Sequence, residues 1–517
     1  MLEMTAQRTA ANLPLEDRAA PLDRGSPVLG LLSTLLGALH QQGVPYCYWK
    51  SAARLPAVLA GESDLDLIVG RTDQHRMARI LLESGFKLFP SAASRDHPAV
   101  LSFLGHDEPG GRIVHVHLHS AVVTGERLLR NYTLPWAPAL IARAVTMRAM
   151  HGVRVLDPAD EAVLLAVRAC LELRRRDPIT LRGWRAAQEK FARDQQALLA
   201  RVDRAAFRGR AAELVGEGAA DLLAADIYAV PSSGLGGRTR RCVRQVLAEY
   251  RTYNAPEARL RAAWRALHWL AGGLNKRHLH WPRPWSRRAP GGGCVVALLG
   301  VDGSGKSTAV AAVRAWLGAE VDVMPIYFGT GDGRPSLLLL PLKLMVPLFT
   351  RVLRRKPRGS SHGPVSDRAP GLLYGVLLAG WATVLAVEKR SKLRAAHRGA
   401  RRGLVVIADR YPQDEIADYN DGPLLPRLAR VPAWLRRFEA RSYALARRLP
   451  PDLVIKLDAP PETLALREPG MDRGVIRERV GAVQRLRFPG ARVVRVDAAQ
   501  PLDGVLRAVK AAVWSML

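Results

Sequence analysis

The segment VVALLGVDGSGKSTAVAAVRAWL, residues 295–317, decides the fold of the C-terminal part of this chain. It begins with an apolar run that predicts a buried strand, and it ends with AVAAVRAWL, which favours a helix. Between them, Gly300 to Ser307 match the pattern G-x-x-x-x-G-K-[ST]. Small residues let the backbone curl so that successive N–H groups face a polyphosphate, and the helix N-terminus adds partial positive charge. The sequence therefore predicts a strand, a phosphate-binding loop and a helix.

The polar residues of this loop have separate expected roles. Lys306 would reach the β- and γ-phosphates of ATP, and Ser307 would ligate Mg²⁺. A glycine-rich turn that matches the pattern by chance is the alternative, but the flanking strand and helix disfavour it. The predicted nucleotide-binding residues are Gly300, Gly303, Ser304, Gly305, Lys306, Ser307 and Thr308.

Three further apolar segments predict more strands of the same sheet. They are Gly403 to Ala408, Pro451 to Asp458 and Arg492 to Val496. The first is followed directly by Asp409-Arg410-Tyr411. Open α/β sheets bind ligands at the carboxyl edge of their strands, so this carboxylate and guanidinium are candidate site residues.

Taken in this order, the segments resemble the thymidylate kinase family of nucleoside monophosphate kinases, over roughly residues 294–517. The resemblance implies ATP and Mg²⁺ as cofactors and a small-molecule phosphate acceptor. It implies that Asp302 contacts the acceptor's sugar hydroxyl and that Asp409 lies near the metal. Arg410 would hold the acceptor phosphate. This assignment agrees with phosphoryl transfer, which needs positioning and charge neutralisation more than a covalent partner.

The same resemblance supplies the remaining candidate residues. Arg467 and Arg473 fall where the family carries its arginine-bearing lid, so they are expected to be catalytic together with Lys306, Asp409 and Arg410. Tyr411 and Tyr419 are expected to bind the acceptor with Asp302 and Arg410. A solvated helix face is the alternative for the two lid arginines.

The chain departs from the family in its acceptor region. An insertion-like stretch runs from Gly329 to about Arg368, and Pro412-Gln413-Asp414 stand where the family usually has a serine. Phosphotransfer to a nucleoside monophosphate is the favoured function. A kinase for a sugar or lipid-linked precursor of envelope polysaccharide is the enzymatic alternative, and a non-catalytic nucleotide-binding regulatory module is the alternative from another class.

A second constellation lies near the N-terminus, in the strand-like GESDLDLIV of residues 61–69. Asp64 and Asp66 are two residues apart, which points both carboxylates to one face of a strand, where they could hold Mg²⁺. The pattern is similar to the nucleotidyltransferase superfamily, with Ser51 and Ser63 as the nearest matches to its small-residue turn. Strand-edge carboxylates that only solubilise the chain are the alternative for Asp64 and Asp66.

The third carboxylate of that superfamily has no counterpart here. The later strand, Arg112 to Leu118, presents His115, His117 and, just beyond it, His119 on one face. Three histidines could bind a transition metal. Because the sequence identifies no carboxylate or thiolate neighbour for them, a hydrogen-bonded core or a degenerate site is the favoured interpretation.

Length and composition predict several domains. At 517 residues the chain is too long for one hydrophobic core, and its hydrophobic content of 48% suffices for globular packing. We predict an α/β protein whose C-terminal part is a three-layer P-loop NTPase fold with a parallel sheet. The predicted division is a polar N-terminus over residues 1–25, a nucleotidyltransferase-like α/β domain over 26–155, a helical domain over 156–274, a basic linker rich in Pro and Gly over 275–293, and a thymidylate-kinase-like P-loop domain over 294–517.

The chain carries a formal charge of +30, which raises the question of an anionic partner. Arginine outnumbers lysine, which indicates compositional bias, and no zinc-finger spacing or RNP-like aromatic motif predicts a specific nucleic-acid partner. The apolar stretches 337–350 and 371–387 are too short or too interrupted to span a bilayer. Basic residues between Lys389 and Arg402 leave peripheral contact with an anionic membrane as an alternative.

The expected compartment follows from the N-terminus and the cysteines. The first twenty-five residues lack the apolar segment of a signal peptide, and the four cysteines have no metal or redox spacing. We expect a cytoplasmic protein, with peripheral contact with an anionic membrane as the alternative. The oligomeric state stays open, with a homodimer as one alternative.

Overall fold

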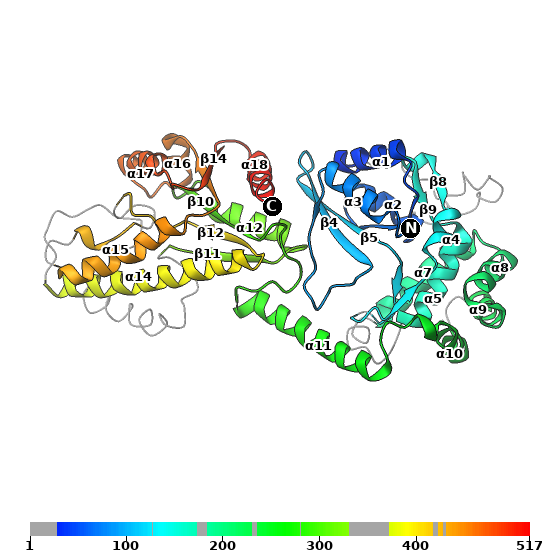
Figure 1. Cartoon of the computed structure of the whole chain (residues 1–517). Coiled ribbons are helices and arrows are strands. Elements are labelled where there is room, and N and C mark those ends of the chain that lie inside the picture. The colour runs from blue at the N-terminus through cyan, green and yellow to red at the C-terminus, as the bar shows by residue number, and fades with distance from the viewer. Residues whose placement is uncertain are drawn as a thin grey trace, which may run out of the picture. The chain divides into compact units, whose positions relative to one another are not determined.

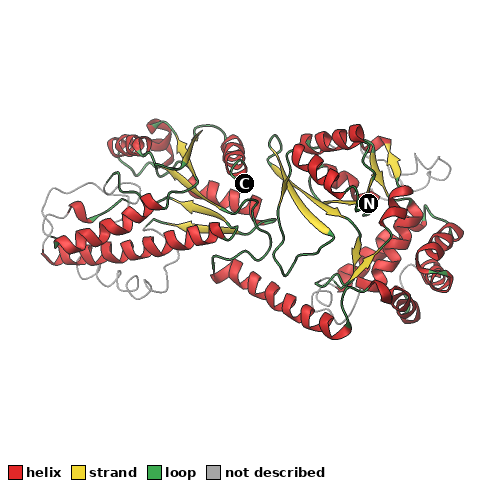
Figure 2. Ribbon diagram, in the orientation of Figure 1, coloured by secondary structure: helices red, strands yellow, loops and turns green. Residues whose placement is uncertain are grey.

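The structure, a computed structural model, divides into two compact units, with the boundary between Ala271 and Gly272 (Figure 1). Each unit contains its own sheet covered by helices (Figure 2). The residues that the structure describes are 28–126, 128–172, 184–229, 235–279, 281–329, 372–416, 422–427 and 431–517.

The second unit is built on a five-stranded sheet in which every neighbouring pair is parallel. Its central strand, β10 (Cys294–Gly300), is buried along its whole length, as expected for a parallel strand covered on both faces. The phosphate-binding loop therefore leaves the sheet at its centre. From edge to edge the strands are β11 (Val323–Tyr327), β12 (Val405–Asp409), β10, β13 (Leu453–Asp458) and β14 (Arg492–Asp497).

Helices cover both faces of this sheet, as the alternation of side chains along β10 requires. Val295, Ala297 and Leu299 belong to one hydrophobic cluster with residues of α14 (Leu372–Arg401) and α15 (Ala433–Arg448). The intervening residues of β10 point to the opposite face. There α12 (Lys306–Gly318) packs against the sheet and against α18 (Leu502–Trp514). The result is a three-layer α/β arrangement.

The apolar stretch expected at 371–387 lies mainly in α14. Its residues Ala382, Leu385 and Ala386 are buried, which accounts for their apolar character by packing within the unit. Among the helices that the structure describes, none combines the length and the apolarity needed to cross a bilayer. The other predicted apolar stretch, 337–350, lies outside the described residues.

The first unit has a mixed sheet of seven strands. At its centre β2 runs parallel to β5 and antiparallel to β1. One face packs on α1 (Gly30–Gln42), α2 (Leu55–Leu59) and α3 (Gln74–Glu83). In spatial order the strands are β3 (Lys87–Leu88), β4 (Val100–Asp107), β5 (Arg112–His119), β2 (Leu65–Val69), β1 (Tyr46–Tyr48), β9 (Val153–Val155) and β8 (Val145–Met147).

The helices that follow the sheet share a core with its other face. Cys47, Trp49 and Ile68 cluster with buried residues of these helices, so the region predicted as a helical domain packs within the same compact unit as the strands. The small pair β6 (Val122–Thr124) and β7 (Tyr132–Leu134) joins the same cluster. The helices are α4 (Ala137–Ala142), α5 (Pro158–Glu172), α7 (Trp184–Leu199), α8 (Arg204–Val215), α9 (Glu217–Ala229) and α10 (Gly237–Val246). The longer α11 (Ala255–Leu274) follows them.

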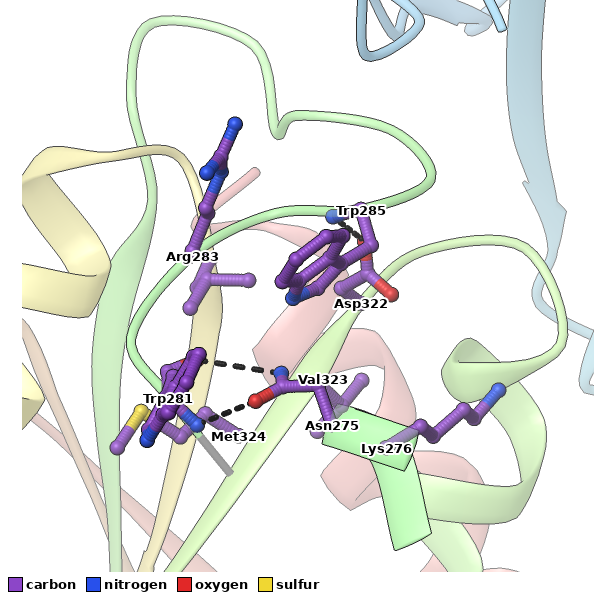
Figure 3. Close-up of a pocket in the computed structure, with 9 residues that line it drawn as sticks. Asn275, Lys276, Trp281, Arg283, Trp285, Asp322, Val323 and Met324 are labelled. Atoms are coloured by element: carbon purple, nitrogen blue, oxygen red, sulfur yellow. Dashed lines mark hydrogen bonds between the residues drawn. The ribbon is translucent and has the colours of Figure 1, made fainter. Parts of the chain in front are cut away.

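The segment predicted as the linker, 275–293, is tied to the second unit. The side chain of Asn275 accepts a hydrogen bond from Trp281 N at 2.7 Å, and Asp322 accepts one from Trp285 N at 2.6 Å (Figure 3). These residues line a pocket with Val323, at the start of β11. In a parallel sheet the starts of the strands lie opposite the edge that carries the phosphate-binding loop, so this pocket lies away from the loop.

Candidate functional site

The backbone of the phosphate-binding loop depends on glycine at defined positions. A Cβ atom on Gly300 would lie 2.4 Å from Ser304 Oγ and 2.9 Å from the Leu457 carbonyl oxygen, so no side chain fits there. Gly305 has a φ of +87°, which other residues adopt only with strain. The backbone geometry of the loop thus requires glycine at positions 300 and 305.

Lys306 begins α12 and folds back over the loop. Its Nζ donates to the Val301 carbonyl at 2.9 Å and lies 3.6 Å from Asp302 Oδ1. Burial lowers the pKa of Lys306, and Asp302 partly opposes that effect. Ser304 Oγ is also buried, and it has no hydrogen-bond partner among the residues that the structure describes. The loop thus carries a cation, together with a buried hydroxyl group that has no partner among the described residues, and both suit a phosphate ligand.

Ser307 and Asp409 meet although they are far apart in the sequence. Leu298 of β10 lies in register with Asp409 of β12, and Ser307 Oγ donates to Asp409 Oδ2 at 3.1 Å. A hydroxyl and a carboxylate oxygen are donors that Mg²⁺ accepts beside phosphate oxygens. These two residues fit the ion.

Asp302 is the centre of the charged cluster. Its Oδ1 lies 2.8 Å from Arg410 Nη2, and its Oδ2 lies 3.2 Å from Arg479 Nη1. With Lys306, three cations converge on one carboxylate. Counting Asp409, the cluster has two acidic and three basic side chains, and it is thus suited to bind an anion.

Arg479 was not among the predicted residues. It lies on α17 (Arg473–Arg485), in which Ile476 and Val483 are buried. Arg479 is three residues after the first and four before the second, so helical periodicity puts it on the same face. That spacing was the signal that could have found it.

The two predicted lid arginines lie in different environments. Arg467, at the end of α16 (Pro461–Arg467), donates to the carbonyl of Ala498 at 3.0 Å and approaches that of Gly303 at 3.5 Å. It is therefore adjacent to the loop. Arg473, the first residue of α17, is exposed. Within α17, the residue that contacts Asp302 is Arg479, which the sequence analysis did not select.

The predicted acceptor tyrosines are not at this cluster. Tyr411 is fully buried between Phe328 and Phe488, and its hydroxyl donates to the Leu449 carbonyl. Its expected role of touching the acceptor does not fit this position, because its side chain belongs to the hydrophobic core. Tyr419 lies outside the described residues. Thr308 is exposed in the first turn of α12.

The N-terminal constellation forms a second cluster on the sheet of the first unit. β2 and β5 are parallel, and Asp66 lies in register with His117. His117 Nδ1 is 3.4 Å from Asp66 Oδ1, and His119 Nε2 is 3.2 Å from the same oxygen. His115 Nδ1 is 3.4 Å from Asp64 Oδ1. The sequence identified no carboxylate neighbour for the histidines, and the structure places both aspartates beside them.

The electrostatics of this cluster follow from burial. Burial lowers the pKa of His119 to about 4 and also lowers that of His117. Burial alone would raise the pKa of Asp66, but Lys50 and the neighbouring histidines bring it well below its usual range. Neutral histidines thus face ionised aspartates at neutral pH.

Ser51 does not serve the aspartates. The carboxylate of Glu161, on α5, accepts a hydrogen bond from the Ser51 side chain and one from Ala52 N at 3.3 Å. The small-residue turn is thereby tied to α5. Asp64 and Asp66 therefore lie in an Asp/His cluster to which Ser51 does not contribute, and β5 supplies no third carboxylate.

Comparison with known proteins adds an independent observation. No family model matches the sequence. The chain is 29% identical over 227 residues to the uncharacterized ATP-binding protein YghS of Escherichia coli strain K12, an alignment that covers 43% of this chain and 93% of that protein. Its distant relatives are ATP-binding proteins and a thymidylate kinase.

Two further alignments have similar extent. YghR of the same strain, also an uncharacterized ATP-binding protein, is 26% identical over 223 residues, covering 42% of this chain and 86% of YghR. The thymidylate kinase of Alkalilimnicola ehrlichii is 28% identical over 244 residues, covering 43% of this chain and 93% of the kinase. These relatives agree with a P-loop, kinase-like part of the chain.

Proposed function

We propose that the second unit is an ATP-dependent phosphotransferase of the nucleoside monophosphate kinase type. The observation that carries the proposal is the convergence of Lys306, Arg410 and Arg479 on Asp302 beside the Ser307–Asp409 pair. The names of the relatives, two ATP-binding proteins and a thymidylate kinase, support the same class.

In this proposal the loop and α12 hold the phosphates of ATP. The backbone N–H groups between Gly300 and Ser307 surround the β-phosphate, and Lys306 moves from the Val301 carbonyl to the β- and γ-phosphate oxygens. Ser307 and Asp409 hold Mg²⁺, which supplies positive charge to the transferring group. The unpaired hydroxyl of Ser304 is a further donor inside the loop.

The arginines serve the acceptor and the transferring group. An oxygen of the acceptor's phosphate forms a bond to the γ-phosphorus as the bond to the β,γ-bridging oxygen breaks, and ADP leaves. A phosphate oxygen is already ionised at neutral pH, so this transfer needs no general base. Arg410 and Arg479 neutralise the charge that gathers between the two phosphates. When the acceptor binds, Asp302 gives up its contacts with Arg410 and Arg479 and contacts the acceptor's sugar hydroxyl instead.

The test is product formation by the full chain. Purified protein is incubated with Mg·ATP and a panel of nucleoside monophosphates and nucleosides, and new phosphorylated products are followed by mass spectrometry. We expect conversion of a nucleoside monophosphate such as dTMP to its diphosphate, and we expect the Lys306→Ala variant to lose it.

The alternatives predict different results. Tight ATP binding with no product from the panel contradicts the nucleotide-kinase proposal and directs the search to sugar or lipid-linked acceptors. If no acceptor is phosphorylated and Lys306→Ala changes only ATP affinity, a regulatory nucleotide-binding module is supported instead.

A further inference from the structure

The Asp/His cluster of the first unit contains two overlapping sets of metal-ligating atoms. Asp64, His115 and His117 form one set, and Asp66, His117 and His119 form the other, with the ligand atoms of each set within 4.8 Å of one another. We propose that this cluster binds one divalent transition-metal ion, held chiefly by Asp66, His117 and His119. The proposal does not rest on the activity of the second unit.

The distances between side-chain atoms fit the ligands of a single ion. In a tetrahedral site with ligand bonds of about 2.0–2.1 Å, neighbouring ligand atoms lie about 3.3 Å apart. The two nitrogens of His117 and His119 lie 3.4 and 3.2 Å from Asp66 Oδ1. The contact between His119 Nε2 and Asp66 Oδ1 is also a hydrogen bond, at the long end of the usual range of about 2.7–3.2 Å. The three side chains thus direct their ligand atoms to a common place, and an ion bound there would replace the hydrogen bond between His119 and Asp66.

The chemistry of the ligands selects the class of ion. Mg²⁺ and Ca²⁺ prefer oxygen ligands, whereas imidazole nitrogens suit zinc, iron, nickel or copper. Two histidines and one carboxylate are a ligand set of catalytic zinc sites and of non-haem Fe(II) sites. The position that a nucleotidyltransferase gives to a third carboxylate is occupied by imidazoles, so a transition metal replaces Mg²⁺ as the expected ion.

The surroundings hold the ligands and leave one side open. The edge of Trp49 packs against the ring of His119, with centroids 4.9 Å apart. The Nδ1 atom of His119 has no hydrogen-bond partner among the described residues, so this ring is held by packing and by the contact of its Nε2 with Asp66. The side chain of His119 is 3% exposed, whereas that of Asp64 is 47% exposed. An ion could therefore enter from the side of Asp64 and keep a coordination position for water.

The fold explains how this ligand set arises from two strands. Because β2 and β5 are parallel and in register, Asp66 stands opposite His117, and every second residue shares their face. Leu65, Leu67, Val116 and Leu118 point to the other face and pack on the first helices. The cluster is thus held by a buried sheet, which keeps the ligand positions rigid.

The experiment uses the full chain without an affinity tag, stripped with a chelator. Zn²⁺ is titrated in competition with a chromogenic chelator, and Co²⁺ is titrated while visible absorption is recorded. We expect one equivalent of tightly bound Zn²⁺ and the visible d–d bands of Co²⁺ with nitrogen and oxygen ligands. Asp66→Asn, which preserves shape, and His117→Ala are each expected to lower Zn²⁺ affinity by at least about tenfold.

Controls separate this site from others. His40→Ala removes an exposed histidine of α1 and should bind Zn²⁺ like the unchanged chain. Circular dichroism checks that each variant folds, and Asp66→Asn keeps the test valid if His117→Ala does not. The proposal is overturned if Zn²⁺ affinity survives in the folded variants, if no stoichiometric binding occurs, or if an intense near-ultraviolet Co²⁺ band indicates cysteine ligands.

Discussion

The charged clusters of the two units have opposite composition. At the phosphate-binding loop, three cations surround Asp302, whereas in the first unit two aspartates face three histidines. The first arrangement attracts a polyanion, whereas the second offers carboxylate and imidazole groups, which are ligands of transition metals. The first cluster lies beyond the carboxyl ends of β10 and β12, with Arg479 contributed by α17, whereas the second lies along the neighbouring strands β2 and β5.

The largest expected effect comes from a substitution that should impair the cluster at the phosphate-binding loop and leave the Asp/His cluster unchanged. Lys306→Ala should lower phosphotransfer by about 10²–10³-fold, because it removes a preorganised cation from the transferring phosphates. It should leave Zn²⁺ affinity unchanged, because Lys306 lies in the other unit. Initial rates and the chelator competition assay measure the two quantities. Loss of both would mean that the clusters depend on each other.

A second prediction compares two arginines on one helix. Arg479→Ala should lower phosphotransfer about tenfold or more, because Arg479 contacts Asp302 beside the loop. Arg473→Ala is the matched control, since Arg473 is exposed on the same helix, and its rate should change little. Steady-state kinetics over both substrates measure the effect. A larger loss for Arg473→Ala would restore the lid role expected from the sequence.

A third prediction concerns the contribution of Gly300 in the loop to the stability of the chain. Gly300→Ala should destabilise the chain by about 1–3 kcal/mol, because its Cβ meets Ser304 and the Leu457 carbonyl. Gly318→Ala is the control, as a Cβ there meets nothing within 4 Å. Denaturant unfolding monitored by circular dichroism measures both. Equal stability of the two variants would show that the loop has room that the structure does not indicate.

The smallest expected effect is a pH dependence in the second unit. His397, on α14, lies 3.0 Å from the Tyr411 hydroxyl, and burial lowers its pKa. The unfolded chain then takes up the proton more readily than the folded one, so stability should fall as the pH drops below about 6.5. His397→Gln should flatten this slope in thermal unfolding between pH 5 and pH 8. An unchanged slope would assign the effect to other groups.

Local patterns predicted the elements better than the contacts between them. The glycine spacing predicted the loop because each position has a backbone reason, and alternation predicted that Asp64 and Asp66 share a face. Alternation did not give the register of β2 against β5, which arises from the packing of the whole sheet. The pairing of Asp66 with His117 was therefore missed.

The misplaced residues have a similar explanation. Tyr411 follows a strand whose end carries the site, and adjacency in sequence suggested the same function. Its side chain points the other way, into the core between Phe328 and Phe488. Arg479 lies far from Asp302 along the chain, and an arginine-rich sequence offers many equal candidates. Its spacing from Ile476 and Val483 indicates the buried face of α17, but only the position of α17 in the fold brings that face to Asp302.

Arg410 has a φ of +68°, a conformation that costs a residue other than glycine about 1 kcal/mol or more. Its N–H bonds to the Leu298 carbonyl while its guanidinium reaches Asp302. Glycine or asparagine here would relax the backbone but remove the cation. A selection for heat resistance alone would therefore favour replacing Arg410, and the variants that it enriched would be the more durable and the less active ones.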